Sequence, residues 1–349
     1  MNNPQSPALA GRFDIIMQRW MAAHAVPRGS IAVMCDERLV VAAGYGGRGA
    51  DDRVPIWSLS KAITALCIAS FIREGKLGLD DPIGPYLARA FAKFGQPADA
   101  RLTRITVAQL LSHRSGIPRA VGDNLFAPGL VQLLRERPVR EARIEMLMSR
   151  ILECRLVRDP GIEFEYTNMG YLLLGQIIEA LAGHSYEEAC TKRVLAMAGV
   201  ANPGLDADWG GIMQAASGWS LSSPEYLAFT RLLRVRPPWL FTRDLAEFLC
   251  TPDGKWMDAG RTAAYTLGVI IEGPGPTFLH SGGHNWKQDD AAGGPIDEAR
   301  GTSFALLPSG SAWVASYDGL SAGTNPQAVV ELGQQLCRAC EQIGPLLGE

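Results

Sequence analysis

Residues 58–75 read SLSKAITALCIASFIREG, and they carry the strongest structural signal in the chain. Apolar side chains fall on nearly every side of the helix that this stretch predicts, and Gly75 supplies its stop. A helix that is apolar all round is buried, so we expect other elements to pack around it. Ser58 and Lys61 stand at its start, which places both side chains on one helix face about one turn apart.

The pattern changes on either side of this helix. Upstream, Phe13, Met17 and Trp20 recur at helical spacing, and two short apolar runs at Ile31–Cys35 and Leu39–Ala43 predict a β-hairpin. Downstream, helices are predicted at Ile105–Ser112, Leu130–Arg135, Ile144–Cys154, Tyr171–Ala182, Tyr186–Ala196 and Pro224–Leu233. Strands are then predicted at Tyr265–Ile271, Thr277–His280, Thr302–Leu307 and Ala312–Tyr317, before a last helix over Pro326–Ile343.

This order of elements predicts an α+β fold. Strands and helices do not alternate, so a doubly wound parallel sheet is not expected. Instead, both ends of the chain join one antiparallel sheet, which is flanked by the N- and C-terminal helices. Residues 1–75 and 255–349 then form a discontinuous α/β sheet domain, and residues 76–254 form an inserted, mainly helical domain.

The composition excludes several classes of protein. The chain has 349 residues, of which 47% are hydrophobic and 20% charged, and its net charge of -3 offers no basic surface for nucleic acid. The longest apolar stretch, inside Ile63–Phe71, is too short to span a membrane. The first residues lack the basic patch and apolar run of a signal peptide. We therefore expect a cytoplasmic protein with no nucleic-acid and no membrane partner.

Neither a metal nor a cofactor is expected. The seven scattered cysteines fit free thiols in a reducing compartment. Cys337 and Cys340 form a C-x-x-C pair, but a zinc site needs a second pair of ligands, and none is near in the sequence. Gly44, Gly46 and Gly49 match a dinucleotide-binding pattern, yet loop-forming residues follow where that site requires a helix.

Three short motifs indicate nucleophilic catalysis by a serine. In chain order they are Ser58-Leu-Ser-Lys61, Tyr166-Thr-Asn168 and His280-Ser281-Gly282. A serine hydroxyl is a poor nucleophile until a base takes its proton. A helical lysine leans toward the helix N-terminus, so the amine of Lys61 reaches the Ser58 oxygen, where the helix dipole favours negative charge. Tyr166 is the partner base or acid, and the sequence does not apportion the proton between Tyr166 and Lys61.

With these motifs the chain resembles the serine β-lactamase-like superfamily, in the group of class C β-lactamases, DD-peptidases, D-aminopeptidases and family VIII esterases. The resemblance covers most of the chain, and the further stretches that carry it are Val26–Val33, Ile105–Gly116, Pro160–Tyr171, Ala216–Glu225 and Tyr265–Gly268. It implies a β-lactamase/transpeptidase-like fold, in which the active site lies in the cleft between the sheet domain and the helical domain.

The resemblance also implies roles for individual residues. Ser58 forms the acyl-enzyme, with Lys61 and Tyr166 as its catalytic partners. Asn168 contacts the acyl group or orients Lys61, and a helix cap is its alternative role. The backbone N–H groups of Ser58 and Gly283 form the oxyanion hole, and glycine at 283 lets the strand approach the substrate.

His280 and Ser281 are implied substrate-binding residues. β-Lactamases and DD-peptidases of this group usually carry Lys at the position of His280, whereas many esterases and D-aminopeptidases carry His. An imidazole binds a carboxylate less firmly than a fixed cation does. Trp57 is bulkier than the family's usual small residue and narrows the expected pocket. The polar segment 284–295 is predicted as a loop that overhangs the site.

The expected function is that of a serine hydrolase acting on a small-molecule ester or amide: an intracellular esterase or amidase, or an acyl transferase. A β-lactamase, a DD-peptidase-type amide hydrolase or a D-aminopeptidase is the alternative. Two hypotheses from other classes are a non-catalytic binding protein on this fold and an α/β-hydrolase using Ser321, although neither Asp nor His follows Ser321. His113, at a helix end, is interpreted as structural. The oligomeric state is not indicated.

Overall fold

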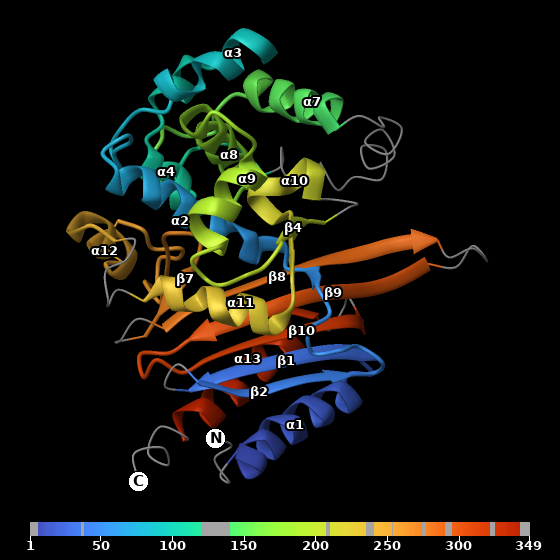
Figure 1. The fold of residues 1–349 in the computed structure, drawn as a ribbon. Helices are drawn as coiled ribbons and strands as arrows, with labels where there is room; N and C mark the ends of the chain where they lie inside the picture. Colours follow the sequence, from blue (N-terminus) through green and yellow to red (C-terminus); the bar gives the residue numbers. More distant parts are fainter. Residues whose placement is uncertain are drawn as a thin grey trace.

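A seven-stranded antiparallel sheet lies at the centre of the protein (Figure 1). The computed structural model describes residues 6–35, 38–119, 140–206, 210–234, 241–252, 254–273, 277–289, 295–321 and 325–342. The strand order is β2-β1-β10-β9-β8-β7-β6. The strands are β1 (Arg28–Cys35), β2 (Arg38–Tyr45), β6 (Ala263–Tyr265), β7 (Ile270–Glu272), β8 (Thr277–Asp289), β9 (Pro295–Leu306) and β10 (Ala312–Ser321). Because β1 pairs with β10, the two ends of the chain meet inside this sheet, as the sequence predicts.

The two faces of the sheet pack into different hydrophobic cores. Along β1, Ile31 and Val33 belong to one core while Ala32 and Met34 belong to the other, as strand alternation requires. The terminal helices, α1 (Ser6–Ala23) and α13 (Asn325–Glu341), cover the first face. α11 (Ser223–Thr230) covers the second face, and the remaining helices lie beyond it (Figure 1). The predicted α+β fold is therefore confirmed.

α2 (Ser60–Arg73) forms the buried centre of the helical part, and every residue from Ser60 to Phe71 is buried. The other helices are α3 (Ala88–Phe94), α4 (Val107–Leu111), α7 (Arg140–Glu153), α8 (Asn168–Ala182), α9 (Tyr186–Cys190), α10 (Gly210–Ser217) and α12 (Arg243–Cys250). None of the described helices is long and apolar enough to cross a membrane. The predicted helix over Leu130–Arg135 lies outside the described residues. The division of the chain into two domains stays a prediction.

A small second sheet, which the sequence does not predict, joins the chain before Ser58 to the helical part. Its strands are β3 (Val54–Pro55), β4 (Gly204–Leu205) and β5 (Trp219–Leu221), in the order β3-β5-β4. The next backbone amide, that of Ile56, donates to the carbonyl oxygen of Trp219 at 3.0 Å. The entry to α2 is therefore fixed by backbone pairing with the segment that follows α10.

Two predictions about strands are wrong. The stretch Tyr265–Ile271, predicted as one strand, contains the end of β6 and the start of β7, with a turn in which Gly268 has φ +74°. In the segment 284–295, predicted as a loop, β8 continues to Asp289 and β9 begins at Pro295, while residues 290–294 lie outside the described ranges. Pairing between these two strands satisfies the backbone there, and a polar composition does not reveal such pairing.

Candidate active site

Ser58 lies in a 3₁₀ turn, Trp57–Leu59, directly before α2. The sequence predicts Ser58 within the helix itself; the structure places it just outside. The preceding residue, Trp57, has φ +50°, a strained conformation for a bulky side chain, and is 7% exposed. This left-handed residue turns the chain so that the Ser58 hydroxyl stands beside the first turn of α2 and remains partly exposed.

Lys61 is completely buried, and its amine has three oxygen neighbours. Nζ lies 3.2 Å from the Ser58 Oγ, 2.7 Å from the Asn168 Oδ1 and 2.8 Å from the carbonyl oxygen of Ala216. No carboxylate within the described ranges forms an ion pair with it. Burial therefore lowers the pKa of Lys61 well below the usual lysine value, because the charged form loses its hydration.

Tyr166 completes the cluster from the other side of Ser58. Its hydroxyl donates to the Ser58 Oγ at 2.9 Å, and its ring centroid lies 4.9 Å from the Lys61 Nζ. Burial raises the pKa of Tyr166, although the hydrogen bond with Ser58 acts in the opposite direction. The Ser58 oxygen is thus held between an amine and a phenol, a geometry in which a proton can leave it on one side and return from the other.

Asn168, the first residue of α8, meets Lys61 through its side chain. The helix cap considered for it is supplied instead by Thr167, whose side chain accepts from the backbone N–H of Met169 at 3.3 Å. The amide oxygen of Asn168 is therefore free to hold the amine. The backbone carbonyl of Ala216, in α10, also accepts a hydrogen bond from the Lys61 amine. No sequence motif identifies a backbone acceptor of this kind.

His113 holds the Tyr166 segment in place. Its Nδ1 accepts from the backbone N–H of Thr167 at 3.3 Å, and its own carbonyl oxygen accepts from the N–H of Glu165 at 2.8 Å. The imidazole centroid lies 4.2 Å from the Tyr166 ring and 4.4 Å from the Tyr265 ring. Burial, together with Lys61 and His280, lowers the pKa of His113 well below the usual histidine value, so the ring is neutral.

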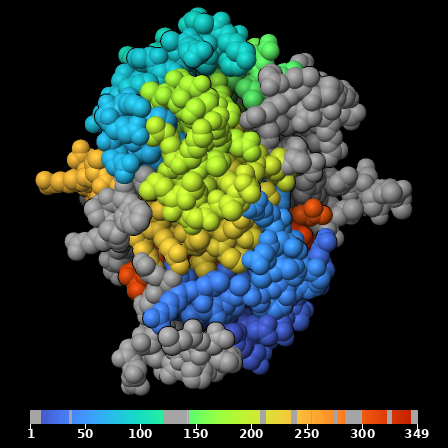
Figure 2. Space-filling view, viewed as in Figure 1, coloured from blue at the N-terminus to red at the C-terminus, as the bar shows by residue number. Residues whose placement is uncertain are grey.

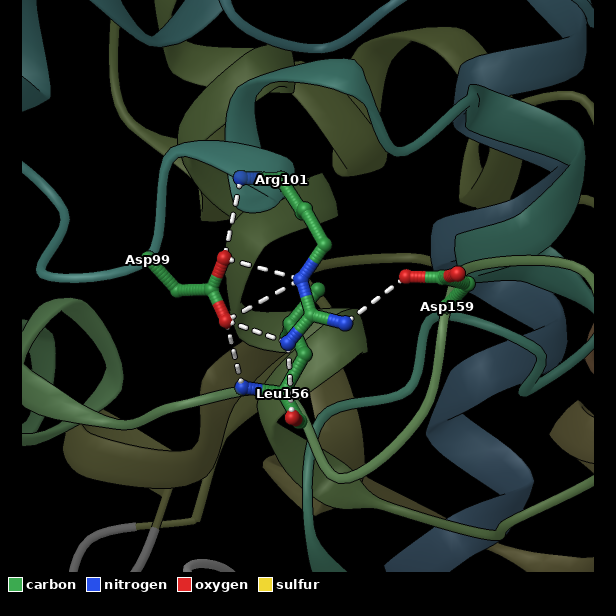
Figure 3. Close-up of polar contacts among 4 residues, drawn as sticks. All are labelled: Asp99, Arg101, Leu156 and Asp159. Carbon is green, nitrogen blue, oxygen red and sulfur yellow. Dashed lines mark hydrogen bonds and ion pairs between the residues drawn. The ribbon is translucent and has the colours of Figure 1, made fainter.

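The irregular chain that leads to Tyr166 is fixed by polar contacts with neighbouring loops. In Figure 3 the Arg101 side chain lies between Asp99 and Asp159; it donates to Asp159 at 2.7 Å and to the carbonyl oxygen of Leu156 at 2.9 Å. Asp99 accepts from the Leu156 N–H at 3.1 Å, and its hydrogen bond with Arg101 lowers the pKa of the Asp99 carboxyl well below its usual range. These contacts replace the regular backbone pairing that the segment lacks.

β8 brings His280 to the other side of the site, with both ring nitrogens engaged. Nδ1 lies 2.7 Å from the carbonyl oxygen of Ser281, which can only accept, so the proton is on Nδ1. Nε2 is then an acceptor and receives the Tyr265 hydroxyl at 2.9 Å. Burial, and secondarily Lys61, lower the pKa of His280 to about 3, so the ring is neutral. Tyr265 is a partner that the motif alone does not reveal.

Two glycines let the sheet approach the nucleophile. A Cβ on Gly282 would lie 2.5 Å from the Ser58 backbone nitrogen, and one on Gly268 would lie 2.5 Å from the carbonyl carbon and oxygen of Lys61. Gly283 is the glycine predicted to let the strand approach the substrate, and a Cβ there would lie 2.7 Å from the Arg300 carbonyl oxygen. Gly283 and Ser281 are exposed on β8, and their roles toward a substrate stay predictions.

Two other chemistries that the sequence raises are a metal site at Cys337 and an α/β-hydrolase nucleophile at Ser321. The seven cysteines form no disulfide bond, and Cys337 is partnered by Trp313, whose Nε1 donates to its sulfur at 3.3 Å. The described residues contain no group of three or more His, Cys, Asp or Glu side chains placed to hold a metal ion. Ser321 ends β10 in a wholly antiparallel sheet, whereas the α/β-hydrolase nucleophile requires a strand-to-helix turn on a parallel one.

The sheet, the terminal helices on one face and the inserted helices on the other define a protein of the β-lactamase/transpeptidase-like fold. A sequence model of the family described as "Beta-lactamase" matches residues 13–330. The chain belongs to the β-lactamase family.

Curated relatives match only part of the chain. Protein flp of Staphylococcus aureus (strain MW2) is 28% identical over 188 residues, which are 52% of this chain and 35% of that protein. A probable fimbrial assembly protein FimD, serogroup H1, of Dichelobacter nodosus is 32% identical over 130 residues, or 37% of this chain and 29% of that protein. The chain thus aligns with about a third of the length of these relatives.

Solved structures resemble the fold over nearly all of the chain. EstCE1, a hydrolase with promiscuous acyltransferase activity, has a TM-score of 0.73 at 15% identity. The match covers 97% of this chain and 100% of the EstCE1 chain. A D-stereospecific amidohydrolase from Streptomyces sp. has a TM-score of 0.71 at 19% identity. The match covers 92% of this chain and 97% of the amidohydrolase chain. At these identities the likeness shows the fold alone.

Proposed function

We propose that this protein is a serine hydrolase that forms an acyl-enzyme on Ser58 and acts on uncharged esters or amides. The observation that carries the proposal is the position of the Ser58 Oγ, 3.2 Å from the Lys61 amine and 2.9 Å from the Tyr166 hydroxyl. The seven cysteines form no disulfide bond, which supports a reducing compartment and is the basis for proposing an intracellular enzyme.

The first half-reaction uses the neutral forms of Lys61 and Tyr166. Two N–H groups of the Lys61 amine donate to Asn168 and Ala216, so its lone pair is left for the proton of Ser58. The Ser58 oxygen then attacks the carbonyl carbon, and the electron pair of the C=O bond moves onto the carbonyl oxygen. When the intermediate collapses, the leaving group takes a proton from Tyr166, which Lys61 reprotonates.

The second half-reaction frees the enzyme. A water molecule gives a proton to the neutral Lys61 amine and attacks the acyl carbon, and the C–O bond to Ser58 breaks. The Ser58 oxygen recovers a proton from Tyr166, and Lys61 returns its extra proton to the phenol. The products are a carboxylic acid and the restored serine. An alcohol in place of water gives acyl transfer by the same steps, so both outcomes share one site.

His280 supports the choice of uncharged substrates. Its ring is 4% exposed, neutral, and bonded through both nitrogens to Ser281 and Tyr265. It therefore offers no cation for a substrate carboxylate, which penicillins and D-alanyl peptides carry. His280, a predicted substrate-binding residue, thus supports an esterase or amidase rather than a β-lactamase.

The test is covalent labelling followed by substrate comparison. Intact-mass analysis after treatment with a fluorophosphonate is expected to show one adduct, mapped to Ser58, which Ser58→Ala abolishes and Ser321→Ala leaves unchanged. An adduct on another residue, or no adduct, overturns the assignment of Ser58 as the nucleophile. A nitrophenyl ester is then expected to give a higher kcat/KM than a chromogenic cephalosporin or a D-alanyl peptide. The reverse order overturns the substrate preference alone.

A further inference from the structure

A cavity lies in the helical part, remote from Ser58. It has a volume of about 580 Å³ and opens between α3, α7 and the end of α8, which lie together at one end of the molecule (Figure 1). Small-molecule sites have volumes of about 300–1,000 Å³, so this cavity is large enough for a ligand. Asn168 begins α8 at the candidate active site, whereas Ala180 lines the cavity roughly 18 Å further along that helix.

Two cations on α3 line this cavity, and no acidic side chain among the described residues forms an ion pair with either. Arg89 and Lys93 are four positions apart, so they share one helix face, and both side chains are exposed. Within the described ranges neither forms an ion pair, and the Lys93 amine lies 4.9 Å from the ring centroid of Phe94. Their charge is therefore available to a ligand.

The acid that lines the cavity is already committed to the protein. The two carboxylate oxygens of Glu179 accept from the backbone N–H of Tyr186 at 3.0 Å and from the side-chain amide of Gln176 at 3.1 Å. These bonds fix the turn between α8 and α9. Neutral donors leave the negative charge of Glu179 in place, so two cations against one carboxylate make the charge of this lining net positive.

The rest of the lining combines polar side chains with an apolar wall, and the polar ones are Gln176, His184 and Ser185. Ala90 and Phe94 come from α3, and Ile144 comes from α7. Tyr86 contributes its ring, since its hydroxyl donates to Asp81 at 2.6 Å. An apolar wall beside two cations on one helix face matches a molecule that is apolar along its body and anionic at one end.

We propose that this cavity binds an amphipathic organic anion, an aryl or alkyl carboxylate, separately from the catalytic site. Its carboxylate contacts Arg89 and Lys93, and its apolar body lies against Phe94 and Ile144. The proposal does not require Ser58 to be a nucleophile, because it concerns binding at residues that take no part in the proposed reaction.

Calorimetric titration with sodium 4-phenylbutyrate tests this site, and neutral 4-phenylbutanamide is the matched ligand. Both are titrated into Ser58→Ala protein, so that neither is consumed. The carboxylate is expected to bind about tenfold more tightly than the amide, because a charge-assisted contact adds to the same apolar burial. Equal affinity of the two ligands, or no measurable binding at about 10 mM, overturns the proposal.

Variants locate the binding. The double variant Arg89→Gln/Lys93→Gln is expected to lose the tenfold preference for the carboxylate over the amide. Arg104→Gln, which removes an exposed arginine outside the lining, leaves it unchanged. Ala180→Phe fills the cavity and is expected to weaken both ligands. A carboxylate affinity that survives both changes in correctly folded protein, checked by circular dichroism, places the anion elsewhere and overturns the proposal.

Discussion

At the scale of single residues, burial sets the protonation of both partners of Ser58. It lowers the pKa of Lys61 and raises that of Tyr166, so each favours its uncharged form. An ammonium with a phenolate contains the same number of protons as an amine with a phenol. Hydration stabilises the charged pair, and this hydration is missing around the fully buried Lys61. The neutral pair supplies the base and the acid that acylation needs.

The first prediction is the pH dependence of kcat/KM. Lys61 accepts a proton only when it is neutral, so activity rises with pH through a pKa that lies well below the ordinary lysine value of 10.5. Tyr166 must keep its proton, and its pKa lies above the ordinary 10.0, so no descending limb is expected below pH 10.0. Initial rates with a neutral ester across this range provide the measurement. A descending limb below pH 10.0 contradicts a protonated Tyr166.

The second prediction concerns His113 as a positioning residue. Its Nδ1 accepts from the Thr167 N–H, and its φ is +56°, so His113→Ala loses an acceptor and takes a strained backbone. Because the loss displaces Tyr166 from Ser58, kcat is expected to fall about 10²-fold with little change in KM. Steady-state kinetics on a neutral ester separate the two constants.

The matched variant is His113→Asn. Asparagine tolerates a positive φ and places an amide oxygen near the position of the histidine Nδ1, so it is expected to recover part of kcat. If His113 only fills space, His113→Leu restores activity better than His113→Asn does. That order of the two variants would refute the positioning role.

At the scale of elements, the sheet and α2 meet through glycine, which sets the third prediction. Gly268→Ala adds a Cβ 2.5 Å from the Lys61 carbonyl, in a turn with φ +74°. The control is Gly254→Ala, where φ is +75° and nothing lies within 4 Å of the added Cβ. The control is expected to cost about 1 kcal/mol of unfolding free energy, from the backbone alone.

Gly268→Ala is expected to cost at least about 2 kcal/mol more than this control, because overpacking adds to the same backbone strain. It also displaces Lys61, so activity falls together with stability. Urea unfolding curves with a common slope give the comparison. Equal losses of stability in the two variants would mean that the contact with α2 relaxes without cost.

The elements that the sequence predicts correctly are those with a buried apolar pattern. α2 is one case, and β1 and β10 are others, since their alternating residues enter two different cores. The segment 284–289 shows no apolar alternation, so its pairing with β9 is not visible in the sequence. Equally, S-x-x-K and Y-x-N identify side chains that meet at Ser58 or Lys61, whereas no motif identifies the Ala216 carbonyl that accepts from Lys61.

At the scale of the whole molecule, one hydrophobic core joins the sheet to the helices. Phe278 and Val314 of the sheet belong to the same cluster as Leu66 of α2 and Leu173 of α8. The strands that enclose it come from both ends of the chain, so the helical part has no separate core of its own within the described residues. The proposed division into domains therefore describes topology, and it does not imply two units of stability.

The last prediction follows from this shared core. We expect one cooperative unfolding transition, with coincident midpoints by far-ultraviolet circular dichroism and tryptophan fluorescence. Leu66→Ala, within α2, and Leu332→Ala, in α13 on the opposite face of the sheet, each remove a buried side chain and are expected to cost about 2–5 kcal/mol. Because the sheet connects both faces, each variant is expected to shift that single transition. A transition that Leu66→Ala splits in two, with fluorescence and circular dichroism separating, would show that the helical part unfolds independently of the sheet.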